Sequence, residues 1–323
     1  MIKIDAHVHL WECQNGIVGG RPVVSVGNGK SDFGGEIRQM MPPYMEDGRN
    51  TAERLIANMD YAGVNGCVVT QEYIDGNQDA YLSQVKEKYP DRFKICALYE
   101  DYLTGPEEFF PKRNAGTGAE RNFASSIFEG NFADDISNGN FVWDGIKICA
   151  GRLADQDLKK LLPLFLKAEQ MGKFISIDMA DGDAQVEDLK YLIEACPDLR
   201  IAIGHFGMVT TPGWQKQIEL AKYPNVRIES GGLTWLFHKE FYPYPSAVEA
   251  ILEAASICGM EKLMWGSDYP RTMTDITYRS AVRFLLESNR LSDADKKAFM
   301  GANAVEFYGF TGLEELTDIG NML

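Results

Sequence analysis

The chain has 323 residues, of which 45% are hydrophobic and 24% are charged. This composition is typical of a folded globular protein and excludes a disordered or fibrous chain. With 47 acidic and 32 basic residues the formal net charge is −15, which argues against nucleic acids and anionic membranes as partners. The length fits two average domains or one large α/β barrel.

The first ten residues, MIKIDAHVHL, enter a strand-like pattern without the apolar core of a signal peptide. No stretch reaches the 18 or so apolar residues of a membrane span. The cysteines are scattered without a Cys-x-x-Cys pair, and several lie in apolar runs, as buried free thiols do: Cys13, Cys67, Cys96, Cys149, Cys196 and Cys258. We therefore expect a cytoplasmic protein that contacts no membrane.

Eight short apolar runs are bounded by glycine, proline or polar residues, which is typical of strands buried on both faces. They are Ile2–Ala6, Gly66–Gln71, Phe93–Leu98, Val142–Ile148, Phe174–Ile177, Arg200–Ile203, Val226–Glu229 and Leu263–Trp265. Helical patterns alternate with them: Thr51–Ala62, Asp79–Tyr89, Asp155–Met171, Ala184–Ala195, Gly213–Ala221, Pro245–Cys258, Asp275–Glu287 and Ser292–Phe307.

This alternation predicts an α/β fold, a parallel (β/α)8 TIM barrel forming a single domain over residues 1–323, with a C-terminal helix at about 292–308. The alternative is an open doubly wound sheet, but the sequence holds no glycine-rich phosphate loop to support one. Trp11–Asn50, Tyr99–Asn140 and Gly231–Pro245 are expected to be long loops after strands 1, 3 and 7. The first and last should contribute lid and wall material at the carboxyl face of the barrel.

His7 and His9 are two residues apart at the end of the first predicted strand. Side chains at i and i+2 of a strand point the same way, so both imidazoles should face the barrel mouth. Two adjacent imidazoles suit a divalent metal. The alternative is a hydrogen-bonded histidine pair without a ligand.

Asp268 follows the eighth predicted strand, which neighbours the first in a closed barrel. Its carboxylate could ligate a metal and take a proton from an attacking water, although it could also cap the next helix. His205 ends the sixth strand between two glycines and could polarise a carbonyl or orient a water; the alternative is a satisfied buried histidine. For His238, in an aromatic insertion, we favour a structural role.

The ends of strands four, five and seven offer Lys147, Asp178 and Glu229. Lys147 could pair with an anionic substrate, or bridge metals if carboxylated, and Asp178 could bind substrate or metal. Arg152 and Arg271 lie just past strands four and eight, where a guanidinium could hold a carboxylate through two hydrogen bonds. Structural ion pairs and surface charges are the competing interpretations.

Four segments carry a resemblance that spans nearly the whole chain: Ile4–Trp11 (IDAHVHLW), Ile203–Gly207 (IGHFG), Trp265–Pro270 (WGSDYP) and Gly301–Ala304 (GANA). In this order they resemble the amidohydrolase superfamily, in the branch that contains sugar-acid and pyrone-dicarboxylate lactonases beside metal-dependent decarboxylases of the aminocarboxymuconate-semialdehyde type. The resemblance implies a barrel with one active site at its carboxyl face. It also implies that His7 and His9 are metal or water ligands, that His205 contacts the carbonyl or substrate, and that Asp268 is the base and a possible ligand.

One departure separates the two groups. Decarboxylase-type members carry a metal-binding histidine at the end of the fifth strand, where this sequence has Asp178. Lactonase members often lack that histidine, and the stretch Ser230–Leu233 and the early tryptophan Trp11 also resemble them. The resemblance therefore favours a lactonase. It implies a divalent metal held by His7, His9 and Asp268, zinc or alternatively manganese, although some lactonases of this kind work without one.

The sequence thus predicts a hydrolase of a small, carboxylate-bearing lactone or related carbonyl compound. The expected catalytic residues are Asp268 and His205, and the expected substrate contacts are Lys147, Arg152, Asp178, Arg271 and Trp11. A decarboxylase of the same superfamily is the first alternative, and a non-catalytic barrel that binds a metabolite is the second. A homodimer is the default expectation for such an enzyme.

Overall fold

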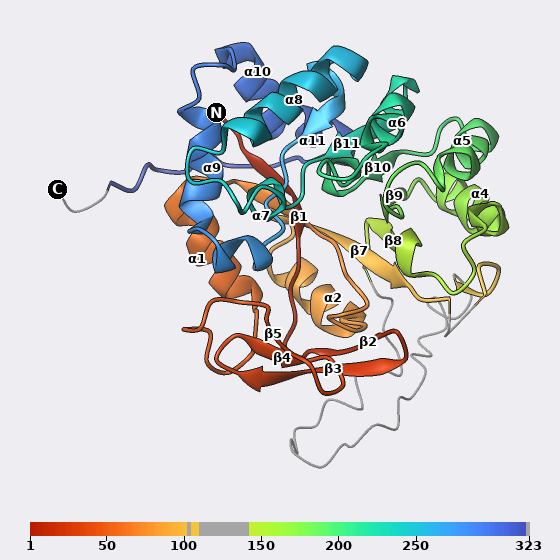
Figure 1. Cartoon of the computed structure of the whole chain (residues 1–323), viewed down its shortest axis with the longest axis horizontal. Helices are drawn as coiled ribbons and strands as arrows, with labels where there is room; N and C mark the ends of the chain where they lie inside the picture. The colour runs from red at the N-terminus through yellow and green to blue at the C-terminus, as the bar shows by residue number, and fades with distance from the viewer. Residues whose placement is uncertain (102–104, 110–141, 321–323) are drawn as a thin grey trace.

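A computed structural model describes residues 1–101, 105–109 and 142–320 (Figure 1). Eight parallel strands follow one another in a single sheet in the order β1-β6-β7-β8-β9-β10-β11-β12. Their bounds are β1 Ile4–Val8, β6 Gly66–Val69, β7 Phe93–Tyr99, β8 Gly145–Cys149, β9 Phe174–Asp178, β10 Ile201–Ile203, β11 Val226–Glu229 and β12 Leu263–Met264. All eight predicted strands are confirmed, with ends shifted by a few residues.

The sheet closes where the segment after β12 meets β1. The backbone N–H of Ala6 donates to the carbonyl of Trp265 at 2.8 Å, and the N–H of Asp268 donates to the carbonyl of His7 at 2.9 Å. Because the last strand returns to the first, the architecture is the predicted (β/α)8 barrel and the open sheet is excluded.

Helices surround the barrel (Figure 1): α1 Ala52–Ala62, α2 Asp79–Lys88, α4 Leu162–Gln170, α5 Val186–Ala195, α6 Trp214–Glu219, α7 Leu233–Leu236, α8 Pro245–Cys258, α9 Tyr278–Leu286, α10 Asp293–Lys297 and α11 Asn303–Tyr308. Local sequence explains several ends. Pro245 opens α8 at a position where no N–H partner is needed, and Ser292 and Asp295 form a capping box on α10. The helix predicted from Asp155 starts later, because Pro163 belongs in its first turn, after a short 3₁₀ turn at Leu158–Leu161.

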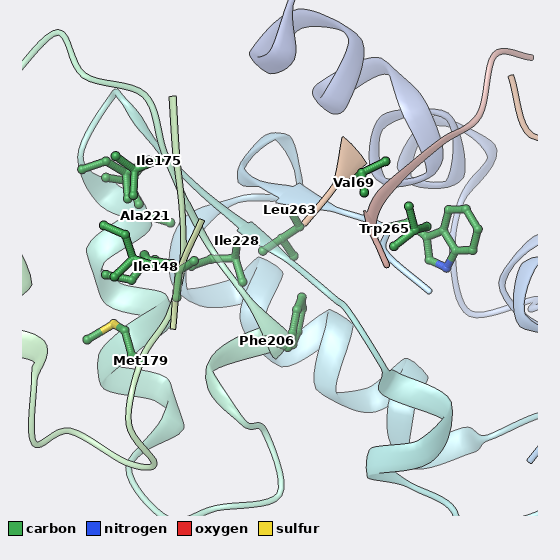
Figure 2. Packing of buried hydrophobic residues seen from close by; sticks show 14 of the residues in the cluster. Val69, Ile148, Ile175, Met179, Phe206, Ala221, Ile228, Leu263 and Trp265 are labelled. Carbon is green, nitrogen blue, oxygen red and sulfur yellow. The ribbon is translucent and has the colours of Figure 1, made fainter. Parts of the chain in front are cut away.

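The main hydrophobic core lies between the strands and the helices. Alternate strand residues such as Ile146, Ile148, Ile175 and Ile177 are fully buried there among helix residues. Figure 2 shows part of this cluster, with Ile148, Ile175, Ile228 and Leu263 labelled; they belong to β8, β9, β11 and β12. The strand residues that alternate with these apolar ones point into the barrel interior, where polar side chains occupy the positions near the carboxyl end.

The amino-terminal end of the barrel is filled by apolar side chains from the strands and from α11. Phe174 contacts Tyr308 with ring centroids 4.8 Å apart, in a cluster with Cys96 and Met264. The side chain of Asn303 donates to the carbonyl of Leu263 at 2.7 Å and to a second carbonyl nearby. The Gly301–Ala304 motif is therefore part of the junction between the last strand and the closing helix.

The expected loop Trp11–Asn50 is instead an antiparallel four-stranded sheet, which lies below the barrel in Figure 1. Its strands are β2 Asn15–Val18, β3 Arg21–Gly27, β4 Lys30–Asp32 and β5 Ile37–Gln39. Glycine pairs such as Gly19-Gly20 suggest a loop by composition, but in this long connection after β1 they form tight hairpin turns at positive φ. The N–H of Asn15 donates to the carbonyl of Asp75 at 3.2 Å, so this sheet supports the segment that follows β6.

Most of the predicted segment Tyr99–Asn140 lies outside the described residues. The segment Gly231–Pro245 contains the short helix α7. All six cysteines are free, and four are buried. Among the described residues, no helix is both long enough and apolar enough to cross a membrane.

Candidate active site

A cavity of about 560 Å³ opens at the carboxyl ends of the barrel strands. Its wall contains seven of the residues singled out from the sequence: His9, Trp11, Arg152, Asp178, His205, Asp268 and Arg271. His7 is fully buried and adjoins this wall through His9 and Asp268. The residues predicted from five separate stretches of sequence therefore meet at one place.

His7 and His9 point the same way from β1, as their spacing predicts. Their Nε2 atoms lie 3.1 Å apart. Each ring also has a carboxylate at its other nitrogen: Glu229 Oε1 is 2.6 Å from His7 Nδ1, and Asp75 Oδ2 is 3.2 Å from His9 Nδ1. A carboxylate at Nδ1 fixes the orientation of the ring and directs Nε2 to a common point.

Asp268 completes this group. Its Oδ1 lies 3.0 Å from His9 Nε2 and 3.7 Å from His7 Nε2, while Oδ2 accepts a hydrogen bond from Trp235 Nε1 at 2.5 Å. The backbone has φ of +59°, a conformation that costs a non-glycine residue roughly 1–3 kcal/mol and is concentrated at functional sites. Its side chain caps no helix, since the residue preceding the next 3₁₀ turn is Pro270.

The charges of the three residues are set by burial and by one another. Burial lowers the pKa of His7 well below its ordinary value, and nearby Lys147 lowers it further, so His7 is neutral. Burial opposes charge on His9 too, but Asp75 and Asp268 raise the pKa of its imidazole to about 10. Burial alone would raise the pKa of Asp268, whereas the hydrogen bond from His9 and the neighbouring imidazoles hold it below the usual range.

Lys147 does not line the cavity. It is fully buried in the middle of β8, and its Nζ lies 2.6 Å from Asp178 Oδ2. Burial works against its charge, but Asp178 raises the pKa of the ammonium group above its ordinary value. The sequence predicts Lys147 as a substrate contact. The structure instead pairs its ammonium group with the Asp178 carboxylate, outside the cavity wall, which is the structural ion pair given as the alternative.

His205 joins this pair to the cavity. Its Nε2 lies 3.4 Å from Asp178 Oδ2, and its Nδ1 is 2.9 Å from the carbonyl of Gly231. Burial opposes protonation, but Asp178 raises the pKa of His205 to about 9. An imidazolium that donates to both oxygens fits this geometry. The preceding Gly204 is required, because a Cβ there would lie 2.0 Å from Asp178 Oδ1.

The two arginines of the wall differ in their partners. Arg152 forms an ion pair with Glu72 at 2.9 Å. The guanidinium of Arg271 lies 5.1 Å from the ring centroid of Trp235, and no carboxylate pairs with it in the part of the chain that the structure describes. Trp11 is nearly fully buried, with its indole N–H donating to the carbonyl of Gly48 at 2.9 Å.

Several site residues were not predicted. Asp75 and Glu72 follow β6, and the available signal for them is that they are polar residues soon after a buried strand. Trp235 lies in the same aromatic stretch as His238, and an aromatic residue in such a stretch gives no signal of a site; His238 itself is exposed, with its Nδ1 2.8 Å from the carbonyl of Trp235. Glu229, whose role the sequence left open, is the partner of His7.

The donor atoms of His7, His9 and Asp268 suit a divalent cation. They lie within 4.8 Å of one another, at separations of 3.0 to 3.7 Å. Ligand atoms around tetrahedral zinc stand about 3.3 Å apart, given zinc–ligand bonds of about 2.0–2.1 Å. Once its Nε2 proton is removed, His9 offers a lone pair beside the Nε2 lone pair of His7 and the carboxylate oxygen of Asp268, so the three residues fit a metal.

This grouping of titratable side chains at the carboxyl ends of barrel strands is the arrangement of a (β/α)8 barrel enzyme. The chain belongs to the amidohydrolase family: the family model, described as amidohydrolase, matches residues 149–310, half of the chain. The match includes Asp178, His205 and Asp268. No curated protein matches the sequence.

Solved structures share the fold. A probable 2-pyrone-4,6-dicarboxylic acid hydrolase from Acinetobacter baumannii with citric acid bound has a TM-score of 0.64 at 19% identity, over 96% of this chain and 100% of its own. An amidohydrolase from Burkholderia multivorans with bound zinc has a TM-score of 0.64 at 15% identity, over 96% and 100%. A 5-carboxyvanillate decarboxylase from Novosphingobium aromaticivorans, complexed with manganese and a nitrobenzoic acid, has a TM-score of 0.52 at 18% identity, over 80% of each chain.

Proposed function

We propose that the chain hydrolyses a small anionic lactone or a related carbonyl compound. The observation that carries this proposal is the position of Asp268, whose carboxylate lies in the cavity wall against the two histidines of β1. A carboxylate held this way can accept a proton from a water that attacks a bound carbonyl. Arg271 lies in the same wall and supports an anionic substrate.

The steps follow from the groups around the cavity. Asp268 accepts the proton of the attacking water, and the positive charge of the His205 imidazolium in the cavity wall stabilises the oxygen on which negative charge develops. Asp178, itself held by Lys147, keeps the imidazole of His205 charged for this role. The proton on Asp268 then passes to the alkoxide that leaves when the ring opens.

The low pKa of Asp268 makes it a weak base for ordinary water. A divalent cation held by His7, His9 and Asp268 would supply the missing acidity by lowering the pKa of the water. Zinc and manganese are the metals we propose for this site. Glu229 and Asp75 hold the two imidazoles in place for such an ion.

A metal-dependent decarboxylase and a non-catalytic metabolite-binding barrel are the alternatives. The Lys147–Asp178 pair argues against the decarboxylase, because the carboxylate at the end of β9 is already neutralised by a lysine rather than free for a metal. A non-catalytic barrel would not need a buried carboxylate held by His9 and Trp235 in the cavity wall.

The test is a panel of sugar-acid and aromatic lactones, with proton release followed by a pH indicator and carbon dioxide measured in parallel. Metal content is determined on the same preparation. Ring opening releases protons without carbon dioxide, whereas a decarboxylase releases carbon dioxide. Binding of panel members without turnover would support the non-catalytic barrel.

A further inference from the structure

Trp235 is the aromatic side chain that touches the proposed base. It lies on α7, the short helix after β11, and its indole N–H donates to Asp268 Oδ2 at 2.5 Å. The opposite oxygen, Oδ1, faces His9. The two oxygens of Asp268 therefore have different partners, and among the described residues Trp235 is the one that donates to Oδ2.

The backbone is shaped to admit this indole. Gly232 has φ of +82°, and a Cβ at this residue would lie 2.0 Å from Trp235 Nε1. Any larger residue would push the indole away from Asp268. The ring is also held by neighbours: the His205 ring lies at 5.9 Å in an edge-on contact, and the Arg271 guanidinium lies at 5.1 Å.

We infer that Trp235 is a positioning residue for the proposed hydrolysis: its N–H fixes the plane of the Asp268 carboxylate so that Oδ1 alone is presented to the histidines and to the water. Gly232 is the residue that makes this contact possible. The kinetic part of this inference rests on the proposed function, whereas the hydrogen bond itself can be measured without any substrate.

The hydrogen bond is tested by NMR on the full chain labelled with ¹⁵N at tryptophan. The chain has five tryptophans, so five indole N–H signals are expected. Trp235→Phe identifies its signal by removing it. An N–H that donates to a carboxylate resonates downfield of a solvated indole, and Asp268→Asn should move this signal upfield while leaving the other four in place. A signal that does not respond to Asp268→Asn overturns the inference.

The positioning role is tested by the split between kcat and KM. Trp235→Phe keeps an aromatic ring and deletes the N–H, so kcat should fall about tenfold to a hundredfold with KM changed less than about threefold. Trp143→Phe is the matched control, since Trp143 lies outside the cavity wall, and its kcat should match the unmodified protein. An unchanged kcat with a raised KM would mean that Trp235 only lines the substrate cavity.

A variant with benzothienylalanine at position 235 covers the case in which the phenylalanine variant fails to fold. This residue replaces the N–H of the indole by sulfur and keeps the shape of the ring. It should reproduce the loss of kcat, and full activity would overturn the positioning role. Absence of turnover in the unmodified protein would instead contradict the proposed function, while the NMR result would still decide the hydrogen bond.

Discussion

The Nε2 atoms of His7 and His9 face each other at 3.1 Å, and a buried carboxylate lies at the opposite nitrogen of each ring. Glu229 holds His7, and Asp75 holds His9. Glu229 ends β11, whereas Asp75 lies in the segment after β6, so two separate parts of the chain flank the two imidazoles. The affinity for the proposed cation would therefore depend on two carboxylates that are not among its ligands.

Glu229→Gln should therefore weaken zinc binding although Glu229 is not a ligand. Its carboxylate accepts hydrogen bonds from His7 Nδ1 and from the N–H of Gly231. The neutral amide of the variant is a weaker acceptor for these two groups. Loss of such a partner lowers metal affinity about tenfold to a hundredfold. The measurement is competition between the protein and a coloured zinc chelator.

The matched control is Glu249→Gln, which changes an exposed carboxylate in an ion pair with Arg290. It should leave the zinc affinity unchanged. Equal affinities of the Glu229→Gln and unmodified proteins would mean that Glu229 has no part in holding the imidazole for a metal.

Lys147→Met should destabilise the fold strongly. The substitution leaves the Asp178 carboxylate without its nearest cation in the barrel interior. Breaking a buried ion pair on one side costs about 3 kcal/mol or more of unfolding free energy. Urea unfolding followed by circular dichroism measures this loss. Lys160→Met, on an exposed lysine paired with Asp155, is the control and should leave the urea midpoint in place.

The double variant Lys147→Met with Asp178→Leu sharpens this prediction. It removes both charges, so most of the lost stability should return. A double variant less stable than Lys147→Met alone would show that Lys147 does not act through Asp178.

Arg271→Ala should raise KM for an anionic lactone about tenfold or more. Arg271 lies in the cavity wall against the Trp235 ring, and no carboxylate pairs with it among the residues that the structure describes, so its donors are available to a substrate carboxylate. Steady-state kinetics with an anionic lactone and its neutral methyl ester distinguishes the loss of the Arg271 charge from the loss of its packing against the substrate. The same loss for both compounds would contradict this role.

Glu72→Gln should lower the KM for an anionic lactone, whereas Arg271→Ala should raise it. Glu72 neutralises Arg152 at 2.9 Å, and both line the cavity. Removing the negative charge leaves Arg152 free to attract an anion, so KM for the anionic lactone should fall while KM for the ester stays the same. A higher KM for the anionic compound would show that Arg152 needs Glu72 to hold its position.

The fold was largely predictable because each barrel strand is a short apolar run and each crossover is a helical pattern. The closing contact between β1 and the segment after β12 followed from strand order alone. The sheet β2–β5 did not, since its strands alternate buried Val23 with exposed Val24 and are separated by glycine turns. Such short two-sided strands have a weak pattern, and composition suggested a loop.

The site was predictable where residues end a strand. His7, His9, His205 and Asp268 all carry this signal, and they meet in the structure. Partners could not be predicted: the pairing of Lys147 with Asp178 depends on the register between β8 and β9, where Cys149 lies opposite Asp178. Trp235 reaches Asp268 from a separate helix, a contact that only the three-dimensional arrangement reveals.

The most direct test compares the unmodified protein with Asp268→Asn on the lactone panel. The amide keeps the shape of the side chain but cannot take a proton from water. We predict proton release without carbon dioxide by the unmodified protein, and a kcat at least about a hundredfold lower in Asp268→Asn, with Asp275→Asn, an exposed aspartate, unaffected. Full activity of Asp268→Asn, or release of carbon dioxide by the unmodified protein, would contradict the account.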